Sequence, residues 1–172
     1  MTTVLVTGPI GGGKSTVCRH LADAGYPVYD CDSGCKALYD SVPGLKLRIE
    51  DELGLPFEEL GKVFARPRKL AQLEKIVYPY LVEDIENWKA SLTSPLAFIE
   101  SAIALQKPEF SHLWDKVLLV DAPAATRHSR NPQAAVRESL QHYDGSLIDY
   151  TIRNDSDLGS LYTKVDNFIA SL

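Results

Sequence analysis

The sequence predicts an α/β fold in which helices cover a parallel β-sheet. Short apolar runs alternate with segments whose apolar residues recur at helical spacing, and the first run ends in a cluster of glycines. A long stretch, residues 33–91, contains no convincing strand. Such alternation favours right-handed crossovers in a doubly wound sheet. We therefore expect one three-layer domain over residues 1–172, with an inserted helical lobe at residues 33–94.

The individual elements follow from apolar runs and from the residues that break them. Strands are expected at residues 3–7, 26–30, 96–100, 116–121 and 147–152. Helices are expected from Lys14 to about Gly25, through most of residues 33–91, and over residues 158–172. Breaks in the long helical stretch are expected at Pro43-Gly44 and at Gly54 to Pro56, and a new helix is expected to start at Pro67.

Composition narrows the function classes. The net charge of -5 argues against a nucleic-acid partner, because duplex binders need a basic surface that displaces counterions. No apolar run reaches the length of a membrane span, and the start of the chain shows no leader pattern, so we expect no membrane partner. Three cysteines without a metal-site spacing are typical of reduced thiols, which favours a cytoplasmic location. The sequence leaves the oligomeric state open.

The glycine cluster carries the strongest chemical signal. Residues 8–15 fit the pattern G-x-x-x-x-G-K-[ST] between an expected strand and an expected helix, the context of a phosphate-binding P-loop. Backbone N–H groups of such a loop surround phosphate oxygens, the lysine bridges the β- and γ-phosphates, and the serine hydroxyl binds Mg²⁺. The motif predicts a P-loop NTPase-type fold with ATP and Mg²⁺ as cofactors, bound by Gly8, Gly11, Gly12, Gly13, Lys14, Ser15 and Thr16.

Acidic residues follow the other expected strands. Asp30 ends the second strand and Asp32 lies just after it, Glu100 ends the third and Asp121 ends the fourth. Ligands of parallel sheets bind at this edge, and a kinase needs a carboxylate to take the proton of the acceptor hydroxyl. Glu100 is a candidate metal ligand, or simply faces the crevice. For the two aspartates, capping of the following helix stays an alternative.

Several motifs together resemble the dephospho-CoA kinase family, and the likeness extends over nearly the whole chain. They are TGPIGGGKST at residues 7–16, GYPVYDCD at 25–32, KVF at 62–64, LEKIVYP at 73–79, IESAI at 99–103, DKV at 115–117, VDAP at 120–123 and IRN at 152–154. The resemblance implies transfer of the ATP γ-phosphate to the 3′-hydroxyl of dephospho-CoA, a small-molecule substrate. It also implies that Asp32 is the general base and that Asp30 supports the substrate or the metal. Tyr78, which has a hydroxyl on an apolar ring, is a candidate substrate contact.

The sequence departs from the family pattern in its lid and on its acceptor side. The lid expected at residues 124–145 is short and keeps only Arg127, Arg130, Arg137 and Gln141 of the family pattern. Arg127 and Arg130 are its best candidates for catalytic arginines, with solvated surface as the alternative. Tyr78 replaces the usual histidine, and an arginine usual near residues 57–60 is missing. Two other functions therefore stay open: a relative that binds ATP or a CoA-like ligand but transfers phosphate slowly, and a kinase for another nucleoside or nucleotide.

Overall fold

The computed structural model describes residues 1–131 and 143–172, which form two compact units. The first unit comprises Met1–Asp30 and Leu92–Leu172, and we call it the sheet unit. The second comprises Cys31–Ser91, and we call it the helical unit. The inserted segment predicted at residues 33–94 thus corresponds to a unit with its own internal packing.

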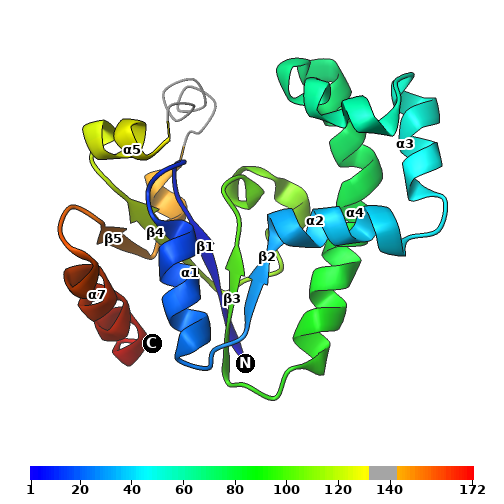
Figure 1. Ribbon diagram of the computed structural model, residues 1–172. Coiled ribbons are helices and arrows are strands. Elements are labelled where there is room, and N and C mark those ends of the chain that lie inside the picture. The colour runs from blue at the N-terminus through cyan, green and yellow to red at the C-terminus, as the bar shows by residue number, and fades with distance from the viewer. Residues whose placement is uncertain (132–142) are drawn as a thin grey trace. The chain divides into compact units, whose positions relative to one another are not determined.

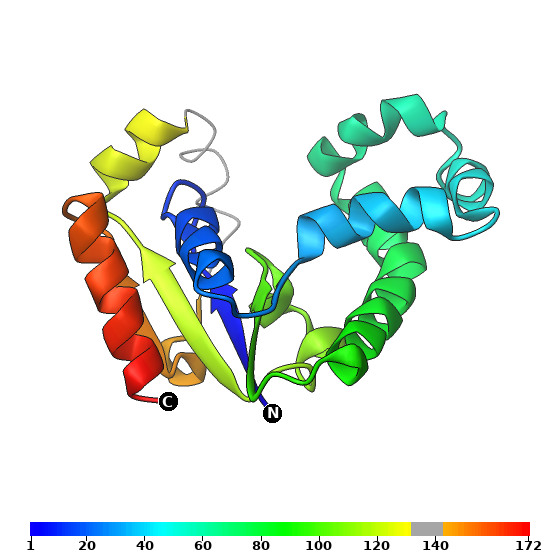
Figure 2. The same cartoon turned by 60° about the horizontal axis from the view of Figure 1, so that its bottom comes forward.

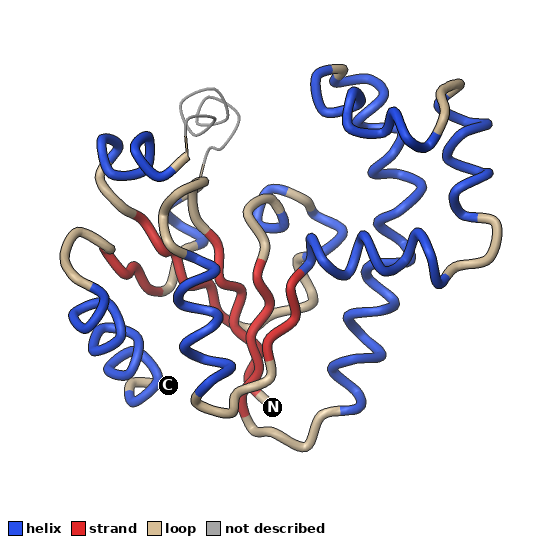
Figure 3. Tube along the Cα trace, viewed as in Figure 1, coloured by secondary structure: helices blue, strands red, loops and turns tan. Residues whose placement is uncertain are grey.

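A parallel sheet forms the centre of the sheet unit. Its strands are β1 (Thr2–Thr7), β2 (Val28–Asp30), β3 (Leu96–Glu100), β4 (Lys116–Asp121) and β5 (Tyr150–Arg153), in the order β2-β3-β1-β4-β5 (Figures 1 and 3). All four neighbouring pairs are parallel, so every strand ends at the same edge. The predicted α/β P-loop fold is confirmed by this topology.

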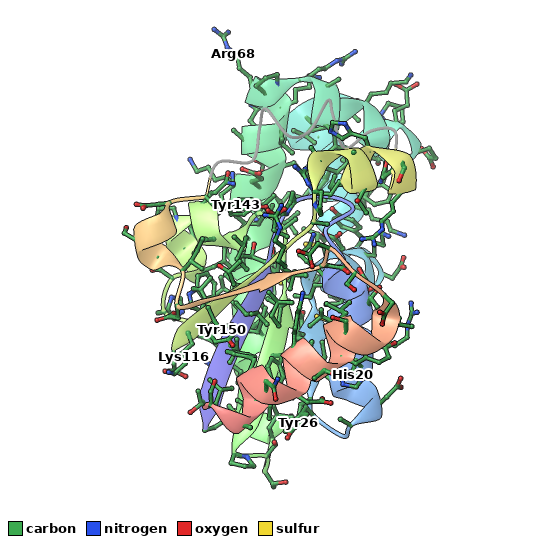
Figure 4. The ribbon with its side chains drawn as sticks, turned by 90° about the vertical axis from the view of Figure 1, so that its left-hand side faces the viewer. His20, Tyr26, Arg68, Lys116, Tyr143 and Tyr150 are labelled. Atoms are coloured by element: carbon green, nitrogen blue, oxygen red, sulfur yellow. The ribbon has the colours of Figure 1, made fainter. Side chains whose placement is uncertain are left out.

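Helices α1 (Lys14–Asp23) and α7 (Leu158–Ala170) cover one face of the sheet and lie side by side (Figure 2). Val6, Leu21 and Val165 are fully buried in the core between them. At the far end of α1, the His20 ring stacks on Tyr162 with 4.0 Å between ring centroids, and its Nε2 lies 2.8 Å from a carboxylate oxygen of Asp166 (Figure 4). These contacts fix α7 against the helix that begins at the glycine cluster.

The opposite face of the sheet buries alternate residues of the same strands. Successive side chains of a strand point to opposite faces of the sheet. Leu5 and Ile99 point to this second face and are 0% and 1% exposed. The short 3₁₀ helix η2 (Ala104–Gln106) contacts β1 and packs against η3 (Pro108–Phe110). The remaining described elements of this unit are α5 (Ala124–Arg130) and η4 (Gly145–Leu147).

Two strand boundaries differ from the prediction by two residues or more. The last strand starts at Tyr150, not at Leu147, because the Asp144 carboxylate accepts from the Ser146 N–H and holds the preceding residues in the turn η4. The second strand starts at Val28, because the Tyr26 N–H is used to close the end of α1 on the Leu21 carbonyl. Apolar residues alone marked both segments as strand.

The helical unit consists of α2 (Cys31–Ser41), α3 (Leu45–Leu53), the 3₁₀ helix η1 (Phe57–Ala65) and α4 (Pro67–Ser91). Its breaks lie where the sequence predicted them, with Gly44 and Gly54 at φ of 76° and 60°. Helix α2 begins two residues earlier than expected, directly after β2. No helix within residues 1–131 and 143–172 is long and apolar enough to cross a membrane.

Candidate active site

The phosphate-loop sequence forms a tight turn between β1 and α1. Gly8, Gly11 and Gly13 have φ of +146°, +78° and +107°, values that side-chain-bearing residues rarely adopt. The loop lies directly on β4, because a Cβ on Gly8 would come within 2.0 Å of the Val120 carbonyl oxygen. The glycines are therefore required by both backbone conformation and close approach.

Two cations bond to the carbonyls of this loop. Lys14 Nζ donates to the carbonyl oxygens of Gly8 and Pro9, at 2.9 and 3.3 Å. Arg130, at the end of α5, donates from a guanidinium nitrogen to the Gly11 carbonyl at 3.1 Å. Both positive charges therefore lie beside the loop, which suits binding of a phosphate.

A pocket of about 410 Å³ opens beside the loop, and the sheet unit supplies all of its lining. One part of the lining comes from the loop, the start of α1 and Arg130; the other comes from the segment after β5 and the start of α7. The lining residues are Gly11, Gly13, Lys14, Ser15, Thr16, Arg130, Asn154, Ser156, Leu158 and Leu161. The lining thus combines cationic side chains, Lys14 and Arg130, with the apolar side chains of Leu158 and Leu161.

Ser15 and Glu100 form an oxygen-rich pair at the ends of α1 and β3. Ser15 Oγ donates to Glu100 Oε1 at 2.9 Å, and Asp30 lies opposite Glu100 in the β2–β3 register. Burial raises the pKa of Glu100 above its ordinary value, and the charge of Asp30 adds to this, whereas the bond from Ser15 and the charge of Lys14 lower it.

The two predicted lid arginines have different environments. Arg127 is 7% exposed; its Nε donates to the Ala122 carbonyl at 2.9 Å and lies 3.6 Å from a carboxylate oxygen of Asp121. These bonds fasten α5 to the end of β4, and Arg127 does not line the pocket. Arg130 is exposed and does line it. Arg137 and Gln141, the other remnants of the lid pattern, lie outside the described residues.

The predicted acceptor residues belong mostly to the helical unit. Asp30 is the last residue of β2, and Asp32 lies exposed in the first turn of α2, where a negative charge is favourable for the helix dipole. Capping therefore remains an alternative for both. Tyr78 is only 7% exposed inside α4, which leaves little of its surface for a substrate. Arg68 projects from α4 into solvent (Figure 4).

Sequence reasoning assigned no role to the second wall of the pocket, although Asn154 lies in the family-like run IRN at residues 152–154. Asn154 directly follows β5, and Ser156, Leu158 and Leu161 continue into α7. These residues lie about 140 positions after the phosphate loop and match no general motif. Their position could have identified them, because residues that follow a parallel strand lie at the same edge of the sheet as the phosphate loop.

Comparison with known proteins supplies the family context for this pocket. A family model described as dephospho-CoA kinase matches residues 2–142. A dephospho-CoA kinase of Porphyromonas gingivalis is 37% identical over 139 residues, which cover 76% of this chain and 68% of that protein. The crystal structure of TT1252 from Thermus thermophilus has a TM-score of 0.80 and 28% identity, covering 99% of this chain and 97% of that one. A dephospho-CoA kinase structure from Campylobacter jejuni, at 19% identity and a TM-score of 0.60, covers 99% and 96% and shares the fold.

Proposed function

Because the chain belongs to the dephospho-CoA kinase family, we propose that it transfers the γ-phosphate of ATP to the 3′-hydroxyl of dephospho-CoA, giving CoA. The family match confirms the resemblance that the sequence motifs indicated. The observation that carries the proposal is the pocket in which Lys14 and Ser15 of the phosphate loop lie beside Arg130.

The nucleotide occupies the pocket with its phosphates on the loop. Lys14 exchanges its bonds to the Gly8 and Pro9 carbonyls for bonds to the β- and γ-phosphates, and Thr16 contacts the α-phosphate. Arg130 supplies a second positive charge to the transferred group. Leu158 and Leu161 offer an apolar surface for the base.

The Ser15–Glu100 pair suits Mg²⁺, which prefers oxygen ligands and takes one or two carboxylates together with substrate phosphates. No group of three or more His, Cys, Asp or Glu residues within 1–131 and 143–172 forms a protein-only metal cage. This agrees with an ion held partly by the nucleotide. When bound, Mg²⁺ neutralises charge on the phosphates.

The acceptor assignments extend the proposal to the helical unit. Asp32 accepts the proton of the 3′-hydroxyl as general base, and Asp30 supports the substrate or the metal. Tyr78 supports the acceptor site, mainly by packing, in view of its burial. Arg127 acts on the transferred group indirectly, by fixing the helix that carries Arg130. A cytoplasmic location and the absence of nucleic-acid or membrane partners remain predictions from composition.

The test is a product assay with purified protein, Mg²⁺-ATP and dephospho-CoA, in which ADP release and the mass of CoA are measured together. We expect ADP release that depends on dephospho-CoA and yields CoA, with Lys14→Ala as the inactive control. ATP binding without product from any acceptor would instead support the slow relative, and turnover of a nucleoside monophosphate alone would support the other-kinase alternative. Either outcome would overturn the proposal.

A further inference from the structure

The phosphate loop receives one hydrogen bond from a distant neutral side chain. Asn154, the residue after β5, donates from Nδ2 to the Gly12 carbonyl at 3.0 Å. Its own backbone N–H donates to the Asp121 carbonyl at 2.6 Å, so its position is fixed by the end of β4. Asn154 is 6% exposed, and its bond to Gly12 is a buried one.

Asn154 also packs against the next residue of the loop. A Cβ added to Gly13 would come 2.3 Å from Asn154 Nδ2, so the carboxamide touches the backbone at the position where φ is +107°. Gly12 itself lies over β4, where a Cβ would be 2.7 Å from the Val120 carbonyl oxygen. The peptide that joins Gly12 and Gly13 is thus held between the strand and the asparagine.

The direction of this peptide matters for phosphate binding. In a trans peptide the N–H of one residue points opposite to the carbonyl of the residue before it. A bond that holds the Gly12 carbonyl toward Asn154 therefore turns the Gly13 N–H away from it. Phosphate cradles work by presenting successive N–H groups to the anion, and an inward carbonyl would repel it.

Lys14, Arg130 and Asn154 all bond to loop carbonyls, but they differ in charge. Lys14 and Arg130 are cations, so a phosphate competes with the carbonyls of Gly8, Pro9 and Gly11 for them. Asn154 is neutral, and an anion has no comparable attraction for it. The bond from Asn154 is therefore the one best suited to persist while a nucleotide is bound.

From these contacts we infer that Asn154 is a positioning residue, which orients the Gly12–Gly13 peptide so that the Gly13 N–H serves the nucleotide phosphates. The inference rests on the proposed function only in that the loop binds phosphate. It differs from the alternative that Asn154, as a pocket-lining residue, contacts the nucleoside directly.

The test compares Mg²⁺-ATP with Mg²⁺-tripolyphosphate, which has the phosphates and no nucleoside, by calorimetric titration of the full chain. Asn154→Asp keeps the shape and replaces the donor with a second acceptor facing a carbonyl. We expect it to weaken binding of both ligands by a similar factor, about tenfold or more, the loss expected for one hydrogen bond replaced by repulsion. The matched control is Asp155→Asn, the reverse exchange one residue later at an exposed ion pair with Lys164, which should leave both affinities unchanged.

Each other outcome overturns the inference. If Asn154→Asp weakens ATP but not tripolyphosphate, the residue contacts the nucleoside. If only the melting temperature falls and both affinities persist, its role is structural. Should Asn154→Asp not unfold cooperatively, Asn154→Ala decides by the same comparison, with weaker binding of both ligands expected. Failure of the wild-type chain to bind either ligand would overturn the proposed function itself, a result distinguishable from all of these.

Discussion

Replacing Gly8 by alanine tests whether β4 forms the floor of the phosphate loop. The new Cβ would lie 2.0 Å from the Val120 carbonyl oxygen, 1.4 Å short of the 3.4 Å at which ordinary contact begins. A backbone carbonyl within a paired strand cannot rotate away as a side chain would. The loop must therefore shift, and with it the N–H groups that surround the phosphates.

The expected cost has two parts. A non-glycine residue in a conformation reserved for glycine costs about 1–3 kcal/mol, and forced overpacking costs about 1–3 kcal/mol more. For a chain of this size the two together predict a fall in Tm of roughly 5–20 °C. Because the displacement is centred on the phosphate loop, we expect ATP affinity to fall by about 10²-fold or more.

Two other glycines separate strain from collision. Gly25 has φ of +90° and nothing within 4 Å of an added Cβ, so Gly25→Ala carries only the conformational cost. Gly12 has no positive φ but would place a Cβ 2.7 Å from the same Val120 oxygen, so Gly12→Ala carries only the collision. Thermal unfolding and ATP titration should show lower Tm with normal ATP affinity for Gly25→Ala, and weakened ATP binding for Gly12→Ala. The reasoning is refuted if Gly8→Ala matches Gly25→Ala in both measurements.

Three further substitutions test the individual side chains. Lys14→Ala should abolish measurable ATP binding in calorimetry and CoA formation in the product assay; retained turnover would remove Lys14 from the mechanism. Asp32→Asn should keep ATP affinity while kcat falls by roughly 10² or more, and an unchanged kcat would remove the base assignment. Glu100→Gln should raise Tm at neutral pH. Burial raises the folded-state pKa of Glu100 above its ordinary 4.5, so the folded protein loses stability as pH rises through that folded pKa and the buried carboxyl ionises. A neutral glutamine does not ionise and avoids this loss. The difference in Tm should vanish below about pH 4, where Glu100 is protonated in both the folded and the unfolded state. Equal Tm values at all pH would contradict the burial argument. In a titration of turnover with Mg²⁺, the variant should need a higher Mg²⁺ concentration for half-maximal rate.

Most of the sheet could be predicted because β1, β2, β3 and β4 each contain a short apolar run bounded by glycine, proline or an acidic residue. The prediction of strand boundaries failed where apolar residues lie in a turn next to the strand. Leu147 is apolar, yet the Asp144 carboxylate draws the Ser146 N–H into a turn just before it. Such side-chain bonds to the backbone compete with strand pairing and leave no periodic signal.

In the site, too, the features encoded by neighbouring residues could be predicted, and those that depend on residues far apart in the sequence could not. The loop and its lysine were predictable because one contiguous motif encodes their geometry. The roles of Asn154 and Arg127 were not, because each depends on which strand end it reaches. Arg127 was predicted as a candidate catalytic arginine of the lid, with solvated surface as the alternative; the structure buries it against Ala122 and Asp121, at the start of the helix that carries Arg130.

The two halves of the proposed reaction can therefore fail separately. The nucleotide half rests on contacts within the sheet unit, from Lys14 to Asn154, and each of those contacts predicts a change in phosphate affinity. The acceptor half rests on Asp32, whose assignment comes from the family pattern and from its place two residues after β2. If the Asn154→Asp variant loses tripolyphosphate binding while the Asp32→Asn variant keeps full kcat, the argument for the phosphate loop holds and another general base is required. The reverse result would retain the base and require another explanation for the buried bond to Gly12.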